Sequence, residues 1–149
     1  SAEEILALNP AGLFLSSGPG DPAALTGVID TVKVLLGKLP IFGLGLGNQV
    51  LGIALGGSTK RLKFGHRGAN QPAKDLATGK VEITAPNHSF VIDADTLPAN
   101  VKVTHLNLND DTVAGICCCE LRAAGMEYTP EPKDGHIFTS FVKAISEAK

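Results

Sequence analysis

Glycine and leucine alternate at positions 43–47, and this run constrains the fold more than any other feature of the sequence. The run follows a short apolar stretch at 40–42 and precedes a helical pattern over 48–55, which two glycines end. A strand that turns abruptly into a helix between flanking glycines is typical of a nucleophile elbow, whose central side chain is exposed at the helix N-terminus. The central residue here is Gly45, so the run predicts an elbow without a nucleophile.

Two other interpretations of these glycines stay open. A phosphate-binding loop would use the same helix N-terminus, but Asn48 and Val50 stand where G-x-G-x-x-G requires a third glycine. The glycines would otherwise simply permit tight packing of the strand on the helix. A second glycine- and proline-rich loop, at 17–22, is either a turn or a set of N–H donors for an anion.

Short apolar runs alternate with helical patterns in the first 57 residues. The run Leu13–Leu15 precedes a helical spacing over Ala23–Leu36, and a second such unit follows, which favours a parallel sheet covered by helices. Later segments alternate between turn signals and predict antiparallel strands. We therefore expect an α/β fold, with a mostly parallel central sheet flanked by helices and an additional small antiparallel sheet. The other expected elements are helices over 1–8 and 137–148 and strands over 59–64, 81–84, 89–92, 101–104 and 112–116.

The composition is that of one folded domain, which we place at 1–149. Apolar residues make up 44% and charged residues 19%, which excludes intrinsic disorder. The net charge is −2 and basic residues do not cluster, so neither nucleic acid nor a membrane is an expected partner. The longest apolar stretch, 40–57, is interrupted by glycines too often to span a membrane. Because the chain opens at Ser1 in a helical pattern, we expect it to belong to a longer protein.

The cysteines and histidines do not form a recognisable metal site, and we expect no metal and no cofactor. The cysteines are consecutive, Cys117–Cys119, which is a poor disulfide framework and favours a reducing cytoplasm. In a strand the first and third would face one side, half of a metal site at best, so we expect buried, unreactive thiols. The histidines are scattered, the first two in predicted turns, and we expect each to be exposed or hydrogen-bonded: His66, His88, His105 and His136.

Five motifs, in order and spacing, give the chain a resemblance to a known family. They are LFLSSGPGDP at 13–22, PIFGLGLGNQVLGIALGG at 40–57, KFGHRGANQP at 63–72, APNHSFVIDADTLPANVKVTH at 85–105 and YTPEP at 128–132. Over nearly its whole length the chain resembles the class I glutamine amidotransferase domain of the carbamoyl-phosphate synthase small subunit. In that family the domain begins earlier, with further strands, so the resemblance implies that the sheet is incomplete.

The resemblance implies a glutaminase mechanism and assigns roles to residues. In the family an elbow cysteine attacks the side-chain amide of glutamine, and a histidine oriented by a glutamate activates the cysteine. The ammonia passes to the synthase large subunit, which uses ATP and bicarbonate to make carbamoyl phosphate. By motif position the cysteine falls on Gly45, the histidine on Thr129 and the glutamate on Glu131. The implied glutamine-binding positions, with oxyanion donors at the backbone of Gly20 and Leu46, are Gly18, Gly20, Leu46, Gln49, Asn87, Ser89 and Phe90.

The chain departs from the family where the chemistry requires particular side chains. Gly45 carries no nucleophile, and Thr129 cannot transfer a proton as imidazole does. Asn48 replaces a histidine after the elbow, and Ser89 replaces a glycine. The strand before Thr129, at 123–127, is less apolar than its family counterpart, and the cysteines fall in a family loop.

We therefore expect a domain that does not hydrolyse glutamine but keeps a binding or scaffold role. Its expected partner is a synthase large subunit or an equivalent synthase domain, and some affinity for glutamine is expected to remain. Two alternatives stay open. One is an active amidotransferase with an unrecognised nucleophile, and the other is an anion- or nucleotide-binding module that uses the loop at 43–47.

Overall fold

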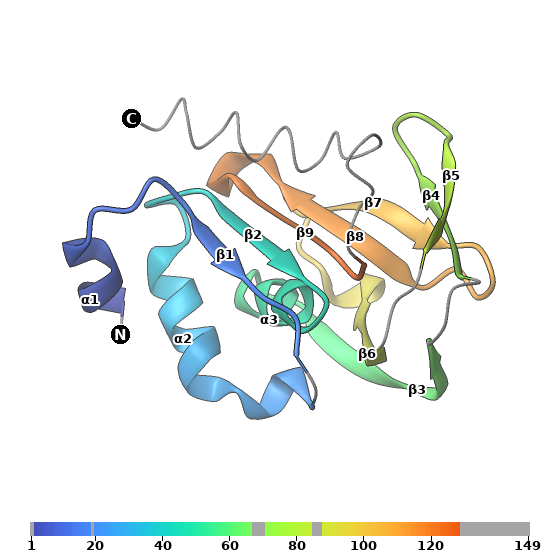
Figure 1. Ribbon diagram of the computed structural model, residues 1–149, viewed down its shortest axis with the longest axis horizontal. Helices are drawn as coiled ribbons and strands as arrows, with labels where there is room; N and C mark the ends of the chain where they lie inside the picture. Colours follow the sequence, from blue (N-terminus) through green and yellow to red (C-terminus); the bar gives the residue numbers. More distant parts are fainter. Residues whose placement is uncertain (1, 19, 67–70, 85–87, 129–149) are drawn as a thin grey trace.

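The computed structural model describes residues 2–18, 20–66, 71–84 and 88–128 (Figure 1). Its helices, strands and 3₁₀ turns (η) are α1 (Ala2–Ala7), β1 (Leu13–Leu15), η1 (Pro22–Ala24), α2 (Thr26–Leu35), β2 (Ile41–Leu44), α3 (Leu46–Ala54), β3 (Ser58–His66), β4 (Gln71–Asp75), β5 (Val81–Thr84), β6 (His88–Asp93), η2 (Ala94–Thr96), β7 (Lys102–Asn107), β8 (Val113–Cys118), η3 (Cys119–Leu121) and β9 (Ala123–Met126). The helix expected at 137–148 and the positions Asn87, Thr129, Glu131 and His136 lie outside the described residues.

The strands of the described ranges form two sheets. The larger has seven strands in the order β1-β2-β9-β8-β7-β4-β5, and β3 pairs with β6 in the smaller. β1, β2 and β9 run parallel, whereas every pair from β9 to β5 is antiparallel. The α/β class and the small antiparallel sheet are confirmed, but within the described residues the large sheet is mixed rather than mostly parallel. Short turns after β4, β7 and β8 account for three of the four antiparallel pairs, because parallel neighbours need a crossover of about a dozen residues or more.

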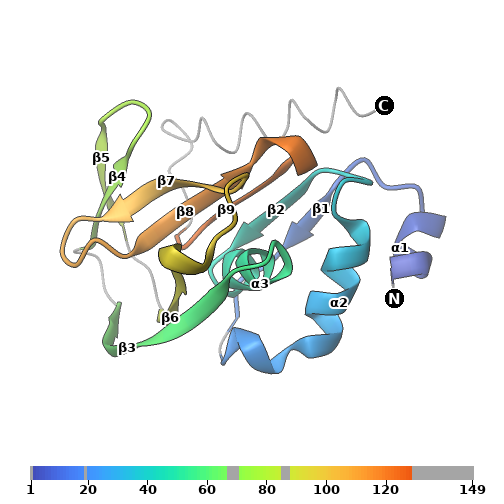
Figure 2. The same ribbon diagram turned by 180° about the vertical axis from the view of Figure 1, so that it is seen from behind.

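Helices α2 and α3 lie side by side on one face of the large sheet (Figure 2). The buried residues of α2, Ile29, Val32 and Leu35, recur at helical spacing and pack in the main hydrophobic core with α3. The opposite face of the sheet carries a smaller cluster around Phe42 and Tyr128. Among the described helices, none has the length and apolar character needed to cross a membrane.

Most of the expected elements that fall in the described ranges are present. β1 coincides with its prediction, and β9 occupies most of the strand expected before Thr129. The second helix begins at Thr26, later than predicted. The preceding residues form η1 instead, with Pro22 in its first turn and Asp21 accepting a hydrogen bond from Ala23 N (2.9 Å).

One strand is not predicted, and two predictions about turns and loops are wrong. Residues 71–75 form β4. The sequence does not predict this strand, because proline, here Pro72, is rare within a sheet. His66 and His88, expected in turns, belong to β3 and β6 and are paired in register, because this ribbon continues past an irregularity after Arg61. The cysteines, expected in a loop, instead end β8 and begin η3.

Candidate functional site

The elbow predicted at 43–47 is present at the junction of β2 and α3. Gly45 has φ 54° and ψ −115°, a backbone conformation that strains residues with a Cβ atom. Its N–H donates to the carbonyl of Met126, the last residue of β9 (2.8 Å), and its carbonyl accepts from Gln49 N (3.2 Å). The elbow therefore lies at the carboxyl ends of two parallel strands, where open α/β sheets form their binding crevices.

The two glycines that flank Gly45 are required by close packing. A Cβ atom on Gly43 would lie 2.5 Å from the carbonyl carbon of Gly47, and one on Gly47 would lie 2.7 Å from that of Leu15. Both contacts are with backbone, which cannot turn aside as a side chain can. Any larger residue at 43 or 47 would therefore separate α3 from the sheet, and the packing interpretation holds at these two positions.

Gly45 itself is less tightly enclosed than the two glycines beside it. An ideal Cβ atom there would lie 3.0 Å from Ser17 Cβ, a tight contact that a slight movement of the loop after β1 would relieve. The same loop approaches the start of α3, because an ideal Cβ on Gly18 would lie 3.4 Å from Leu46 Cδ2. The structure thus brings together three predicted site positions, Gly18, Gly45 and Leu46. Gly20, further along the loop, is exposed and has φ 108°.

A buried carboxylate that the sequence analysis missed lies beside the first turn of α3. Glu127 is only 4% exposed, and its oxygens accept hydrogen bonds from Asn48 Nδ2 (3.1 Å) and Gln49 Nε2 (2.9 Å). Gln49 Nε2 also donates to the carbonyl of Phe90 on β6 (2.8 Å). The predicted positions Gln49 and Phe90 are therefore in contact, but the Gln49 amide nitrogen is engaged within the protein. Ser89 precedes Phe90 on β6 and is half-buried.

Burial dominates the ionisation of Glu127. Removal from water raises the pKa of this carboxyl from 4.5 to about 8, although the hydrogen bonds from Gln49 and Asn48 oppose the rise. At neutral pH the protonated form therefore predominates, which avoids the cost of a buried charge.

The Asn48 amide has a second orientation available for the protonated state of Glu127. Its Oδ1 atom is buried and has no hydrogen-bond partner among the described residues. A half-turn of the amide would place Oδ1 beside Glu127, where it would accept a hydrogen bond from the O–H of the neutral carboxyl. The side chain fits against β9 because Gly125 has no Cβ atom, which would lie 3.0 Å from Asn48 Cγ.

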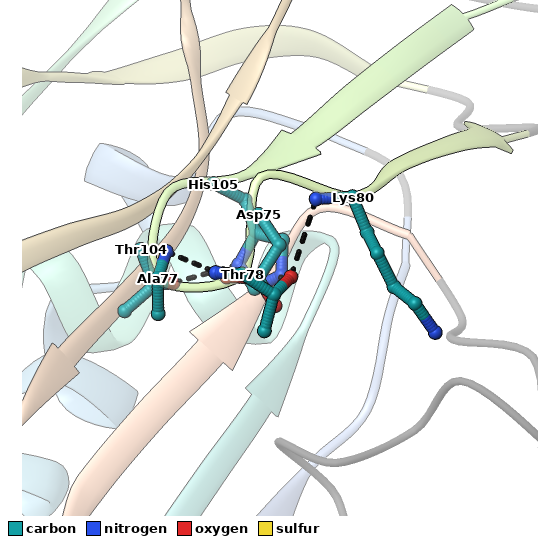
Figure 3. Close-up of polar contacts among 6 residues, drawn as sticks. All are labelled: Asp75, Ala77, Thr78, Lys80, Thr104 and His105. Carbon is teal, nitrogen blue, oxygen red and sulfur yellow. Dashed lines mark hydrogen bonds and ion pairs between the residues drawn. The ribbon is translucent and has the colours of Figure 1, made fainter.

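A second buried polar pair lies in the antiparallel part of the sheet (Figure 3). Asp75 Oδ2 is 3.7 Å from His105 Nε2, and both residues are at most 6% exposed. His105 Nδ1 lies 2.8 Å from Thr104 Oγ1. Asp75 Oδ1 accepts hydrogen bonds from the backbone N–H groups of Ala77 (2.9 Å) and Thr78 (3.3 Å). The pair thus closes the turn after β4 and fastens it to β7, and His105 is buried and hydrogen-bonded.

His105 is too far from the elbow to act as its general base. β7 is separated from β2 by β8 and β9, so three strand spacings, about 14 Å, lie between them. The His105 ring instead meets the Tyr128 ring edge-on, with centroids 6.3 Å apart. Burial, and then the nearby Glu82 carboxylate, raise the pKa of the Tyr128 hydroxyl, so this phenol stays neutral.

The cysteines lie at the other end of β9 from the elbow. Cys118 pairs with Ala123 at the start of that strand, whereas Met126 at its end contacts Gly45. Cys118 is buried as predicted, but Cys117 is partly exposed and Cys119 exposed, because the strand ends there and the chain turns outward. The part of the chain that the structure describes contains no group of three or more His, Cys, Asp or Glu residues placed to bind a metal.

The family assignment follows from comparison with known proteins. The model of the class I glutamine amidotransferase family matches residues 1–145. The chain belongs to the class I glutamine amidotransferase family. The approach of Thr129 and Glu131 to the elbow stays a prediction, because both lie outside the described residues.

Three relatives that match the chain are carbamoyl phosphate synthase small chains. The chain is 51% identical to that of Akkermansia muciniphila, covering 100% of this chain and 41% of the relative. It is 50% identical to that of Rhodopirellula baltica, covering 99% and 39%, and 44% identical to the chloroplastic protein of Arabidopsis thaliana, covering 99% and 36%. The chain therefore spans about two fifths of the length of these curated relatives.

Solved structures of low sequence identity share the fold. A protein from Thermoplasma acidophilum, described as a candidate GMP synthase component, superposes with a TM-score of 0.74 at 17% identity, covering 92% of this chain and 73% of the other. A glutamine amidotransferase from Thermotoga maritima gives 0.63 at 16% identity, covering 90% and 62%. The expected class I amidotransferase fold is confirmed.

Proposed function

We propose that this chain is a glutamine amidotransferase-like domain that does not hydrolyse glutamine and acts as a binding or scaffold module. The elbow carries the proposal, because it has the strained geometry of a nucleophile position while Gly45 offers no side chain. Without a sulfur atom at position 45, no thioester can form at the elbow. Loss of a covalent nucleophile lowers kcat by about a millionfold in well-studied hydrolases, and loss of the base adds little.

The proposed partner is a carbamoyl-phosphate synthase large subunit or an equivalent synthase domain. The support is that relatives at 44–51% identity are named as small chains of that synthase. A large subunit bound to this module would use free ammonia. We further propose that residues 1–149 form one domain and that it acts in the cytoplasm, where the consecutive cysteines would stay mostly reduced.

Part of a glutamine site is proposed to remain. The first N–H groups of α3 have no helical partners and point toward the elbow, with the positive end of the helix dipole. The loop at Ser17 and Gly18 borders the same bend. The amide nitrogen of Gln49, however, would have to leave Phe90 and Glu127 before it could donate to a ligand. We therefore expect weak binding of glutamine.

The positions of the cysteines argue against an active enzyme with a substitute nucleophile. β9 separates Cys118 from the elbow by its whole length, about 10 Å. The anion-binding alternative uses the same N–H groups of α3, so the ligand that binds distinguishes it from the proposal.

Ammonia release from glutamine by the full chain tests the proposal. The expected rate of ammonia release equals that of the heat-unfolded chain. In a separate thermal-unfolding measurement, glutamine should raise the melting temperature, and ATP or inorganic phosphate should not. A shift with phosphate or ATP alone would favour the anion-binding module. Ammonia release that an electrophilic glutamine analogue blocks would contradict the proposal.

A further inference from the structure

Two of the three consecutive cysteines bring their sulfur atoms into contact. Cys117 Sγ and Cys119 Sγ are 3.5 Å apart, at the end of β8 and the start of η3. Cys118 between them is 0% exposed and belongs to the main hydrophobic core. Because Cys119 is exposed and Cys117 only partly so, a reagent in solvent reaches the pair through Cys119.

We propose that Cys117 and Cys119 form a redox-active dithiol, which low-molecular-weight disulfides such as oxidised glutathione convert into an intrachain disulfide. The sulfur atoms need to approach by only about 1.5 Å to reach the bond length of about 2.05 Å. The backbone permits this movement, because the last strand pair of β8 is Cys118 with Ala123 and Cys119 already lies in the turn. This site is independent of the proposed function.

The oxidation proceeds by two thiol–disulfide exchanges. The Cys119 thiolate attacks one sulfur of the small disulfide, forms a mixed disulfide and releases the first small thiol. The Cys117 thiolate then attacks Cys119 Sγ, breaks the mixed disulfide and releases the second. The dithiol loses two electrons and two protons, which the small disulfide gains as two thiols.

The surroundings assign the order of the two steps. Burial raises the pKa of the Cys117 thiol to about 12, and the hydrogen bond and charge of Cys119 add to the rise. Cys117 is therefore a poor first nucleophile. Once Cys119 is a mixed disulfide, it carries no charge and no longer holds the Cys117 proton by accepting a hydrogen bond, and Lys102, opposite Cys117 on β7, favours the thiolate. The neighbouring position of the two sulfurs then makes the second step intramolecular and fast.

Oxidation of the full chain in a glutathione redox buffer, followed by alkylation and mass spectrometry, tests the proposal. The expected product lacks two hydrogen atoms, carries no glutathione and maps to a bond between Cys117 and Cys119. Cys118 should be alkylated only after unfolding, because it is buried. A wild-type product that keeps one glutathione, or a bond through Cys118, would overturn the proposal.

Serine variants identify the two roles. Cys117→Ser should stop at one glutathione on Cys119, and Cys119→Ser should react at least about tenfold more slowly, because its entry thiol is absent. Cys118→Ser is the matched control and should oxidise like the wild type. Since Cys118 is a core residue, the mapping of the wild-type product decides the matter if this variant does not fold. Equal reaction of Cys119→Ser and wild type would contradict the assignment.

Discussion

The parallel and antiparallel halves of the large sheet each contain a buried carboxyl group, and they satisfy it in different ways. Beside the elbow, Glu127 accepts hydrogen bonds from Asn48 and Gln49, which lie 79 and 78 residues earlier in the chain. In the antiparallel half, Asp75 accepts from Ala77 N and Thr78 N, two and three residues later. The first carboxyl joins elements that are distant in sequence, whereas the second closes a local turn.

This difference shows which half depends on long-range packing. The elbow half has glycines where a helix touches the backbone of two strands, and its carboxyl group is largely neutral because of burial. The antiparallel half is held by short hairpin turns. Substitutions in the elbow half should therefore affect global stability more than matched substitutions in the hairpins.

The largest effect is expected for Gly47→Ala. The new Cβ atom would overlap the backbone of Leu15, so we expect a loss of about 3 kcal/mol or more in the free energy of unfolding. Gly27→Ala in α2 is the control, because a Cβ there meets nothing within 4 Å and alanine favours a helix by about 1 kcal/mol. Urea unfolding of both variants measures the contrast, and equal stabilities would refute the packing argument.

The next effect is expected for Glu127→Gln, and it depends on pH. A carboxyl group whose pKa is raised by folding contributes stability at low pH, and this contribution is lost as pH rises from 4.5 to about 8. The variant has no group to ionise at this position, so its stability should lack this decline, and it should be more stable than wild type near pH 8.

Unfolding curves at several pH values measure the effect of Glu127→Gln. Glu120→Gln is the matched control, because it makes the same substitution at a position that is exposed on η3. If the free energy of unfolding of Glu127→Gln falls with rising pH as steeply as that of wild type, the Glu127 carboxyl is not the group responsible for the decline.

A smaller and local effect is expected for Asp75. Asp75→Ala removes the acceptor for two backbone N–H groups and the partner of His105, and should cost about 2 kcal/mol. Asp75→Asn keeps the turn acceptor and should cost about half as much. Hydrogen exchange should accelerate at Ala77 and Thr78 and leave α3 unchanged. Acceleration throughout α3 would show that the two halves are not separable.

The smallest effect is expected for Gly45→Ala. The positive φ of this residue penalises a Cβ atom by about 1 kcal/mol, and Ser17 has to move slightly. Thermal unfolding beside Gly47→Ala measures the difference between neighbouring elbow positions. A loss as large as that of Gly47→Ala would mean that position 45 has no room for a side chain.

The sequence predicts those features that local patterns determine. The elbow follows from the glycine spacing at 43–47, and β1 from an apolar run between turn signals. β4 is not predicted from the sequence because Pro72 has a poor strand propensity. Its pairing with β5 and β7 overrides that propensity in the structure.

The polar cluster at the elbow depends on tertiary contacts that no local pattern contains. The only sign of Glu127 is that it alternates with the apolar residues Met126 and Tyr128, which places it on the face of Gly125. The two amides that bind it lie more than seventy residues away. The exposure of Cys119 likewise depends on where β8 ends, which is fixed by its pairing with β9.

The central claim is that the elbow survives without its nucleophile and base, and restoring both tests it most directly. The measurement is ammonia release from glutamine by the double variant Gly45→Cys with Thr129→His, beside wild type and Gly45→Cys alone. Where the variants need the additional sequence that the longer relatives have, it is supplied as a separate segment. The account predicts release by the double variant only, together with an adduct of an electrophilic glutamine analogue at position 45. Ammonia release by the wild-type chain at a similar rate, or a folded double variant inert to both reagents, would contradict it.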